Sequence, residues 1–461
     1  MDQLGERAVV LGASMGGLLA ARVLSDFFEA VTVVDRDALS DHPENRRGVP
    51  QGRHTHLLLP RGAQVVEEFF PGILDELVAA GVPVWGDGDL SKLYFCLGGH
   101  EVLRAGRLSI APQDMAMYCA SRPFLEMHVR QRLQAITNVT MLGEHDFAGY
   151  IATGDRVTGV RVIDHDNGTE REVPADLVID AMGRGAHTPA FLERLGYDRP
   201  KEDRVVMRTT YVTQRLHIPR GTLREVFANI SPTEGRPTGL FFVNNEDDTC
   251  TFTVFGMLGQ EPPRDLAGML SFASEYAPAH LLDAVRAGEP IGEVAQYRMP
   301  SSQWRRYDKV RRFPDGLLVT GDAVCSFNPI YGQGMTVSAL DAAALRDCLK
   351  RGSTGLARRY FRASAKPIGV AWQMAATSDL AFPEVEGKRS PSMRITNRIV
   401  DWALAACESD PVVAGRFYKV NGLVDPPARL AHPEFVYRVV AANLRRRRHR
   451  PRPAERTVRV S

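Results

Sequence analysis

Hydrophobic runs at the start of the chain alternate with turn residues in the order strand, turn, helix, strand. Residues 8–11 are apolar and short enough for a buried parallel strand. A glycine-rich turn follows at 12–17, and apolar positions at helical spacing extend over 18–28. A second apolar run occupies 31–34 and ends at Asp35. This order predicts the first half of a doubly wound α/β domain.

Further along the chain the hydrophobic pattern changes from one type of element to another. Residues 61–81 and 122–133 have apolar positions at helical spacing. Between 138 and 178, short apolar runs are separated by turn dipeptides, which predicts strands. Residues 200–300 alternate between apolar and polar positions, as in an antiparallel sheet. A buried-strand run returns at 317–320, and a long helix is expected directly after it.

These patterns predict an α/β protein in which one domain is interrupted by another. We expect residues 1–200 and 301–350 to form a discontinuous, Rossmann-like domain with a parallel sheet. Residues 201–300 would form an inserted antiparallel sheet domain. Residues 351–444 are expected to be helical, and residues 445–461 to be a basic, disordered tail.

The composition is that of an ordinary folded protein. Hydrophobic residues make up 44% and charged residues 24% of the 461 positions, which excludes disordered, fibrous and disulfide-stapled chains. The net charge is +2, but residues 445–461 hold eight arginines and a single acid, so the rest of the chain is mildly acidic. One short arginine run does not predict nucleic-acid binding. Contact of this tail with anionic lipid or an acidic protein stays open as an alternative to a solvated terminus.

Three further features bear on location and on metals. No apolar run is long enough for a transmembrane helix, and the N-terminus has no secretory signal, so we expect a cytoplasmic protein. The six cysteines include no CxxC pair, which disfavours a zinc or dithiol site. His54 and His56 lack further ligands at suitable spacing, so no metal site is predicted.

The turn at 12–17 has the composition of a phosphate-binding loop. Gly12 allows a tight turn, and Gly17 allows the following helix to pack closely on the strand. Backbone N–H groups at such a helix start bind a pyrophosphate. Ser14 stands where the usual pattern has a second glycine, and its hydroxyl can donate to a phosphate oxygen. Asp35, at the end of the next strand, can accept the hydroxyl groups of a ribose, so we predict a dinucleotide site.

A second turn of the same kind follows the strand at 317–320. Asp322 comes directly after this strand and can hold a polyol. Pro329 and a glycine-rich turn at 332–334 then precede the helix expected at 335–349. The first N–H groups of that helix would face an anion or a carbonyl group. The density of Gly, Pro and Asp before one helix favours a ligand site over a plain connection.

Three separated motifs together carry a resemblance to a known family. They are Gly12-x-Ser14-x-x-Gly17 with Asp35, the strand end Asp180-Ala181-Met182-Gly183-Arg184, and Gly321-Asp322-Ala323 followed by Pro329 and Gly332-x-Gly334. Over residues 6–350 they resemble the FAD-dependent monooxygenases of the para-hydroxybenzoate hydroxylase type. The stretches 47–56 and 327–332 are similar to epoxidases of polyether-antibiotic pathways, such as those that make lasalocid and monensin. The resemblance implies a glutathione-reductase-type FAD-binding domain with an inserted antiparallel substrate-binding sheet and C-terminal helices.

The same resemblance implies roles for individual residues. Gly12, Ser14 and Gly17 would hold the FAD pyrophosphate, Asp35 the adenosine ribose, and Asp322 the ribityl chain. Residues 332–335 would present N–H groups to the flavin N1–C2=O edge, which becomes negative on reduction. Arg47, Asn328 and Pro329 would face the flavin, and no catalytic base is identified. The full implied cofactor-binding set is Gly12, Ser14, Met15, Gly17, Asp35, Arg36, Arg47, Gln51, Arg122, Gly183, Asp322, Gly332, Gln333, Gly334 and Met335.

The implied reaction is the insertion of one oxygen atom from O2 by way of a flavin C4a-hydroperoxide. We expect epoxidation of alkenes in a large, apolar, polyketide-like small molecule, with aromatic hydroxylation as the alternative within the same fold. A flavin halogenase is disfavoured because no Trp-x-Trp-x-Ile-Pro segment is present. A flavin-free lipid-binding or chaperone protein is the alternative from another class. NAD(P)H would supply the electrons, either directly or through a separate flavin reductase.

Apolar residues of the inserted sheet could either line a substrate pocket or form its core. The residues in question are Phe241, Phe242, Phe252, Phe255 and Met257. Side chains of this kind are most often buried in a core, and we favour that interpretation for the group.

Overall fold

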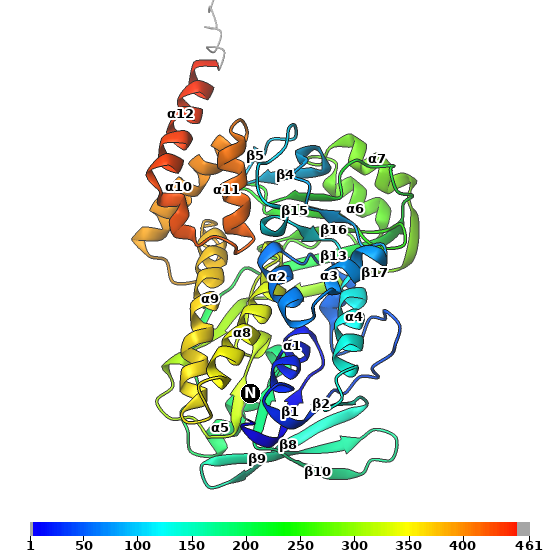
Figure 1. Cartoon of the computed structure of the whole chain (residues 1–461). Coiled ribbons are helices and arrows are strands. Elements are labelled where there is room, and N and C mark those ends of the chain that lie inside the picture. The colour runs from blue at the N-terminus through cyan, green and yellow to red at the C-terminus, as the bar shows by residue number, and fades with distance from the viewer. Residues whose placement is uncertain (1–2, 450–461) are drawn as a thin grey trace, which may run out of the picture.

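The computed structural model describes residues 3–449 and has two main parts, one above the other in Figure 1. The lower part contains a five-stranded parallel sheet in the order β19-β11-β1-β2-β7. The strands are β1 (Gly5–Leu11), β2 (Phe28–Val34), β7 (Val139–Leu142), β11 (Leu177–Asp180) and β19 (Leu317–Val319). Four of these five strands are the short apolar runs that the sequence pattern identified as buried strands.

Helices pack against the parallel sheet. They are α1 (Met15–Leu24), α4 (Arg122–Gln134), α5 (Thr188–Arg194) and α8 (Gly334–Leu349). The two glycine-rich turns lead into α1 and α8. Helix α8 contacts α1 and carries the long α9 (Leu356–Asp379) on its other side. A three-stranded antiparallel sheet of β8 (His145–Thr153), β9 (Arg156–Asp164) and β10 (Glu170–Pro174) covers the bottom of the domain in Figure 1.

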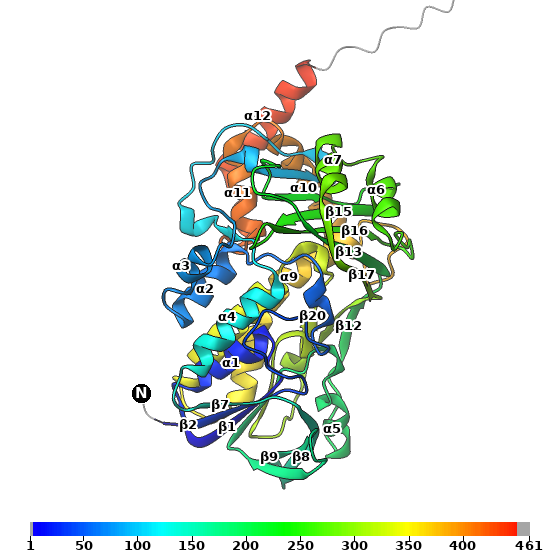
Figure 2. The ribbon, with the colours of Figure 1, turned by 90° about the vertical axis from the view of Figure 1, so that its right-hand side faces the viewer.

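The upper part is built on a seven-stranded sheet in the order β17-β13-β16-β15-β14-β4-β5. Its strands are β4 (Leu93–Leu97), β5 (His100–Glu101), β13 (Thr209–His217), β14 (Phe227–Ile230), β15 (Thr238–Asn244), β16 (Thr249–Gly256) and β17 (Glu289–Met299). The small helices α6 (Leu266–Ala273) and α7 (Ala279–Ala287) cover one face, as Figure 2 shows. The other face looks toward the parallel-sheet domain and the C-terminal helices.

The upper sheet draws strands from two separate stretches of chain, whereas the sequence pattern placed it within residues 201–300. Strand β4 pairs in parallel with β14, from Leu93 opposite Phe227 to Cys96 opposite Ile230. This pairing joins residues more than a hundred positions apart, and a parallel neighbour leaves no turn signal in the sequence. Two-stranded and three-stranded sheets link the parts: β3 (Val84–Trp85) with β6 (Met117–Tyr118), and β12 (Glu202–Val205) with β18 (Ser302–Arg305) and β20 (Cys325–Ser326).

One expected helix is divided in the structure. Residues 61–81 form α2 (Pro60–Phe69) and α3 (Ile73–Ala79) instead of a single helix. Gly72 between them has a φ of +84° and lies in the left-handed region, where it precedes the first residue of α3. Pro71 has no backbone N–H and a fixed φ, so it cannot continue the hydrogen bonding of α2. The apolar spacing in the sequence nevertheless continues across this helix boundary.

The C-terminal helices pack beside the upper sheet. They are α10 (Pro391–Cys407), α11 (Pro411–Asn421) and α12 (Pro433–His449). The edge strand β5 meets α10, where His100 contacts the carboxylates of Glu408 and Asp401. Helix α12 runs past Leu444 to His449, into the segment that the sequence analysis assigned to the tail, and residues 450–461 lie outside the described part of the chain. No helix among the described residues is long and apolar enough to cross a membrane.

Candidate active site

A single large cavity begins at the carboxyl ends of the parallel strands. Leu11 and Val34, the last residues of β1 and β2, line it together with Ala181 and Thr320, which follow β11 and β19. The cavity has a volume of ≈ 2410 Å³ and continues between the upper sheet and the C-terminal helices. Ligands of open α/β sheets bind at the carboxyl ends of the strands, so this end of the cavity is the expected cofactor side.

The first turn has no room for side chains at Gly12 and Gly17. Gly12 has a φ of +101°, and a Cβ there would lie 2.7 Å from the carbonyl oxygen of Ala181. A Cβ on Gly17 would lie 1.8 Å from the carbonyl oxygen of Gly12. Gly17 therefore brings α1 close to the strand, and it is the one residue of the implied cofactor set that does not line the cavity.

The start of α1 is left without a side-chain cap. Ser14 is the N-cap residue, yet its hydroxyl makes no cap hydrogen bond. Instead Ser14 Oγ donates to Glu126 Oε2 at 3.0 Å and accepts from Arg122 Nη2 at 2.6 Å. No side chain therefore accepts a hydrogen bond from the first N–H groups of α1, which leaves these donors available to a bound anion.

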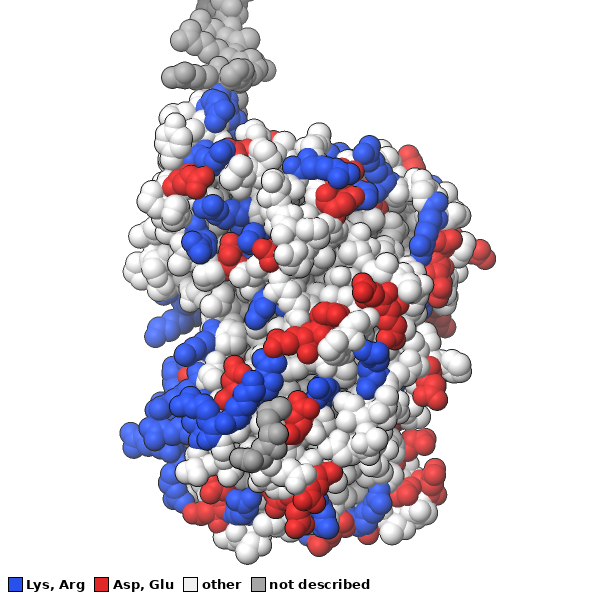
Figure 3. All heavy atoms as spheres, viewed as in Figure 1, with Lys and Arg blue, Asp and Glu red and all other residues white. Residues whose placement is uncertain are grey.

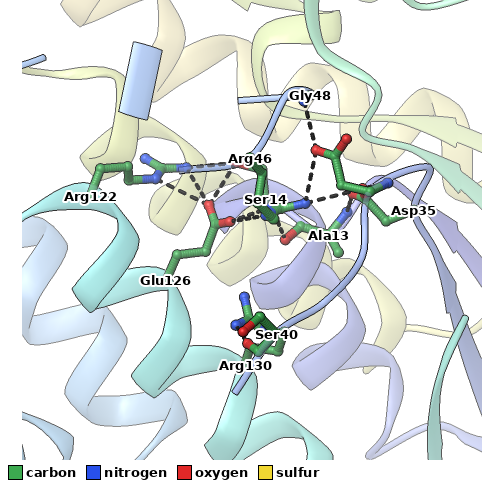
Figure 4. Close-up of polar contacts among 10 residues, drawn as sticks. Ala13, Ser14, Asp35, Ser40, Arg46, Gly48, Arg122, Glu126 and Arg130 are labelled. Carbon is green, nitrogen blue, oxygen red and sulfur yellow. Dashed lines mark hydrogen bonds and ion pairs between the residues drawn. The ribbon is translucent and has the colours of Figure 1, made fainter. Parts of the chain in front are cut away.

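Charged side chains behind this turn form a network that Figure 4 shows. Glu126 of α4 lies between two guanidinium groups and pairs with both Arg46 and Arg122. Arg46 also contacts Asp35 Oδ1 at 3.1 Å. Burial alone would raise the pKa of Glu126, but Arg122 and Arg46 outweigh it and hold the pKa below its usual range. The network fixes the residues on which the first turn rests.

Sequence reasoning did not identify Arg46 or Glu126. A signal for Glu126 was present, because it follows Arg122 by four residues on one helix and pairs with it there. Arg46 comes from the long loop between β2 and α2, and nothing in its local sequence points to Asp35. Asp35 itself is occupied on both oxygens: Oδ2 accepts from Ala13 N–H at 2.6 Å, and Oδ1 accepts from Asp37 N–H at 2.9 Å.

The second turn follows β19, and its Gly321 lies beside Gly16 of the first turn. Asp322 is exposed to the cavity although it lies deep in the protein, and burial raises its pKa while Arg122 and Arg184 oppose the shift. Gly332 has a φ of +65°, and neither it nor Gly334 has any atom within 4 Å of an added Cβ. Gln333, the N-cap of α8, makes no cap hydrogen bond, and its Oε1 is buried with no donor. The cavity wall at residues 332–334 thus has open space, and Gln333 Oε1 in it is an acceptor without a donor.

The structure brings almost the whole implied site together. Apart from Gly17, every residue of the implied set lines the cavity, as do the flavin-facing candidates. The lining members are Gly12, Ser14, Met15, Asp35, Arg36, Arg47, Gln51, Arg122, Gly183, Asp322, Asn328, Pro329, Gly332, Gln333, Gly334 and Met335. They come from segments that are far apart in the chain and meet only where the strands of the parallel sheet end.

A polar cluster lies beyond the second turn. Asn328 is central: its Oδ1 accepts from the Tyr211 hydroxyl, and its Nδ2 donates to Asp379 Oδ1 at 3.0 Å. The hydroxyl of Tyr331 donates to the same Asp379 oxygen at 2.8 Å. Burial raises the pKa of Asp379 to about 7, against the hydrogen bonds from Tyr331 and Asn328. Tyr211, Asn328 and Tyr331 line the cavity, so Asp379 is linked to it through two side chains.

Comparison with known proteins now decides the family. Residues 6–375 match a family model described as "FAD binding domain".

The chain belongs to this FAD-binding family.

Two curated proteins and one solved structure are similar to the chain. The chain is 38% identical over 453 residues to Protein Rv3254 of Mycobacterium tuberculosis, which covers 95% of this chain and 94% of that protein. It is 26% identical to the kynurenine 3-monooxygenase of Salinispora tropica, over 76% of this chain and 74% of that enzyme. The p-nitrophenol 4-monooxygenase PnpA of Pseudomonas putida superposes with a TM-score of 0.63 at 16% identity, covering 92% of this chain and 99% of that chain.

The fold is shared with halogenating enzymes as well. The flavin-dependent brominase Bmp2 superposes with a TM-score of 0.65 at 13% identity, covering 96% of this chain and 100% of that chain. At this identity the likeness shows the fold alone. The FAD-binding family and its monooxygenase relatives make the protein an FAD-dependent monooxygenase, as the sequence predicted. None of these similar proteins is described as a polyether epoxidase, so they do not show that finer resemblance.

The wall of the cavity suits FAD in three respects. The uncapped N-termini of α1 and α8 offer N–H donors to a pyrophosphate and to a flavin carbonyl group. Asp322 offers carboxylate oxygens to a chain of hydroxyl groups. The buried Oε1 of Gln333, which has no donor, suits an N–H group of a bound ring system. In each of these places, bound FAD would supply a hydrogen-bonding partner for the protein atoms.

The far half of the cavity is mostly apolar. Aromatic side chains from β3, the upper sheet and α11 form its wall; they are Trp85, Phe95, Phe227, Phe241 and Tyr418. Phe241 packs against Phe227 with the rings 6.3 Å apart and nearly parallel. The expectation that the inserted-sheet apolar residues form core holds for the rest of that group, since Phe242, Phe252, Phe255 and Met257 are buried and do not line the cavity.

Two half-buried histidines line the cavity. His54 lines the cavity, and its Nδ1 lies 2.7 Å from Thr213 Oγ1. Burial and the neighbouring Arg53 lower the pKa of His54 to about 4, and burial with Arg122 lowers the pKa of His56 to about 3. Both rings are therefore neutral at physiological pH. Within residues 3–449 no group of three or more His, Cys, Asp or Glu side chains is placed to hold a metal ion.

Proposed function

We propose that the protein epoxidises alkenes in a large, apolar, polyketide-like small molecule. The observation that carries this proposal is the extent and polarity of the cavity. Its volume of ≈ 2410 Å³ exceeds the roughly 300–1,000 Å³ of common ligand pockets, even with FAD occupying one end. Its far half is walled by aromatic and aliphatic side chains, which suit an extended apolar molecule better than a small, charged one.

In this proposal the residues near the two turns bind the cofactor. Gly12, Ser14 and the start of α1 hold the pyrophosphate, with Arg122 at its side. Asp35 and Arg36 bind the adenosine ribose, and Asp322 binds the ribityl chain. The remaining roles are those of the flavin ring: residues 332–335 present N–H groups to its N1–C2=O edge, and Met15, Arg47, Gln51, Gly183 and Pro329 enclose it. When bound, FAD supplies the activation of O2 that no amino-acid side chain provides.

The apolar wall has a second task in the reaction. Water that reaches an activated oxygen species wastes it as H2O2, so the site must keep water away from the substrate side. Phe227 and Phe241 face the cavity and carry no polar group with which to hold water there. An alkene receives an electrophilic oxygen without prior loss of a proton, so this half of the cavity needs no general base.

Aromatic hydroxylation is the second candidate, and the polar cluster favours it. A phenol reacts faster once its hydroxyl proton has moved away. The Tyr331 hydroxyl reaches the cavity and donates to Asp379, whose pKa of about 7 allows it to exchange a proton near neutral pH. In this candidate the cluster takes the phenolic proton through Tyr331. The flavin-free binding protein loses its support, because the chain belongs to the FAD-binding family.

The electron donor in this proposal is NAD(P)H, acting directly or through a flavin reductase. Both nucleotides are available in the cytoplasm, where we place the protein. Anaerobic addition of NADPH to the yellow protein distinguishes the two routes: rapid bleaching indicates direct reduction. No bleaching with or without substrate, followed by activity when a flavin reductase is added, indicates a partner.

Product analysis tests the reaction. An apolar polyene and an alkylphenol of similar length are each incubated with enzyme, NADPH, a flavin reductase and isotopically labelled O2. We expect an epoxide with one labelled oxygen from the polyene and a low yield of H2O2. A labelled catechol from the phenol, with the polyene untouched, would replace epoxidation by hydroxylation. Consumption of O2 that yields only H2O2 with every apolar substrate would overturn both.

A further inference from the structure

The C-terminal helices expose a group of apolar side chains, which we name the C-terminal patch. It consists of Ile395, Ile399 and Trp402 on α10 and Val436, Val440 and Leu444 on α12. On each helix these positions repeat every three or four residues, so they occupy one face. Ile395 is 64% exposed, Leu444 53% and Trp402 46%. Such large side chains seldom gather on the surface of a protein unless the surface meets another apolar body.

The two rows of the patch lie next to each other. Helices α10 and α12 pack together, and Asn443 Nδ2 donates to the carbonyl oxygen of Trp402 at 3.0 Å. Four members of the patch, Ile399, Trp402, Val436 and Val440, also line the active-site cavity. A side chain that is both exposed and on the cavity wall marks an opening, so the apolar half of the cavity reaches the surface at the patch.

Basic side chains border the patch. Arg394 and Arg398 are exposed on α10, each directly before an isoleucine of the patch. Arg445 and Arg446 lie near the C-terminal end of α12, and the sequence continues with arginines at 447, 448, 450 and 452. In Figure 3 blue side chains lie along α12 above a broad white surface at the level of α10. Apolar side chains beside clustered arginines match a surface that is apolar inside and anionic outside.

The acidic side chains near the patch offset only part of the charge of these arginines. Asp401 and Glu408 both contact His100, and Glu408 also pairs with Arg446. Glu434 at the start of α12 lies within reach of Arg416 and Arg438. Each acid is thus engaged within the helical region, while the arginines outnumber them at the end of α12.

We propose that the C-terminal patch docks on an anionic lipid membrane, with its apolar side chains among the acyl chains and its arginines at the headgroups. An amphipathic helix pair with Trp and Arg is the chemistry of interfacial binding. A protein partner bound to the patch would cover the opening of the cavity. A bilayer would instead place that opening against the apolar acyl chains. Entry of an apolar substrate from the bilayer rests on the proposed function, but docking itself does not.

Vesicle flotation tests the docking. Purified holoprotein is mixed with vesicles of phosphatidylcholine alone or with a third of phosphatidylglycerol. We expect flotation with the anionic vesicles, weakened by high salt, and little with the neutral ones. The variant Ile395→Gln/Leu444→Gln changes two side chains of the patch that do not line the cavity. It should weaken binding roughly tenfold or more, because two exposed aliphatic anchors are lost.

Matched charge variants separate a specific surface from general basicity. Arg394→Gln/Arg398→Gln should weaken binding to anionic vesicles by roughly thirtyfold, because each arginine near the surface contributes about 1 kcal/mol. Arg358→Gln/Arg362→Gln removes the same charge from exposed positions on α9 and should bind like the wild type. An equal loss in both double variants would overturn the assignment to the patch.

Two further readouts keep the test independent of folding and of the reaction. FAD content and thermal unfolding verify that each variant is intact. Trp402 is the one tryptophan of the patch, so its emission should move to shorter wavelength with anionic vesicles, and Trp402→Phe should remove this change. An active, yellow protein that does not float would overturn the docking and leave the proposed function standing. A wild-type dimer that the patch variants make monomeric would assign the patch to a second copy instead.

Discussion

The two halves of the cavity are built in different ways. The cofactor side is made of short local motifs in which a strand, a turn and a helix follow one another directly, as in residues 8–18. The substrate side takes its wall from segments that lie far apart, such as Phe95, Phe241 and Tyr418. The first half is fixed by backbone geometry and buried charge, and the second by the packing of apolar side chains. The two halves should therefore respond differently to substitution.

The largest effect on the cofactor side, the loss of bound FAD itself, is expected at Gly17. An added Cβ would lie 1.8 Å from the carbonyl oxygen of Gly12, so Gly17→Ala must push α1 away from the strand. We expect loss of bound FAD and a drop of about 3 kcal/mol in the free energy of unfolding. Flavin absorbance per protein and denaturant unfolding measure the two. Gly149→Ala, where the nearest atom is the flexible end of Arg161 at 3.7 Å, is the control and should change neither.

The next effect depends on pH and concerns Asp379. Its pKa is raised to about 7, so the folded protein binds a proton that the unfolded chain releases near pH 4. The associated stability is complete below about pH 4 and is lost as pH rises through 7. Asp379→Asn keeps the acceptor for Tyr331 and Asn328 without a charge to bury. It should match the wild type near pH 4 and exceed it by roughly 4 kcal/mol at pH 8.

Denaturant unfolding of both proteins from pH 4 to 8 checks this prediction, and the difference between them isolates the one carboxyl group. A difference that does not change with pH would show that Asp379 is ionised in the folded protein throughout. If the polar cluster takes a proton from phenols, the pH profile of hydroxylation should also lose its step near pH 7 in Asp379→Asn.

A smaller effect is expected at Glu126. Glu126→Gln keeps the size of the side chain but leaves Arg46 and Arg122 as neighbouring buried cations. We expect a loss of about 3 kcal/mol without FAD. The loss should be smaller with FAD, because the pyrophosphate supplies negative charge at the same place. Thermal unfolding with and without FAD measures both. Glu261→Gln removes an exposed partner of Arg298 and should cost at most about 0.5 kcal/mol.

The smallest effect is expected on the substrate side. Phe241→Leu shortens one aromatic side chain of the cavity wall and should lower kcat/KM for an apolar substrate by roughly fivefold, about 1 kcal/mol. FAD content should not change. Phe242→Leu alters the neighbouring residue, which is buried and does not line the cavity, at a similar cost in stability. Equal losses of kcat/KM in both variants would mean that Phe241 acts through the core and not through the cavity.

Almost all of the residues that the sequence implied for a cofactor line the cavity. Their signals are local: Gly12 and Gly17 obey steric limits within one turn, and Asp35 and Asp322 follow buried strands whose ends meet at one edge of the sheet. The polar cluster could not be found in this way. Asp379 is the last residue of a helix of 24 residues, and no sequence motif surrounds it. Tyr211 lies in β13, and nothing in the sequence near it indicates that its hydroxyl contacts Asn328.

The sequence by itself determined the parallel strands, the two glycine-rich turns and the basic C-terminal end, because each depends on contacts between residues close together in the chain. Only the tertiary structure decided which aromatic side chains line the cavity, since Phe241 and Phe242 are neighbours with opposite faces. It also decided that β4 completes the upper sheet and that Arg46 and Glu126 meet beneath the first turn. These contacts join distant segments, and their energy comes from burial and charge pairing that no local pattern records.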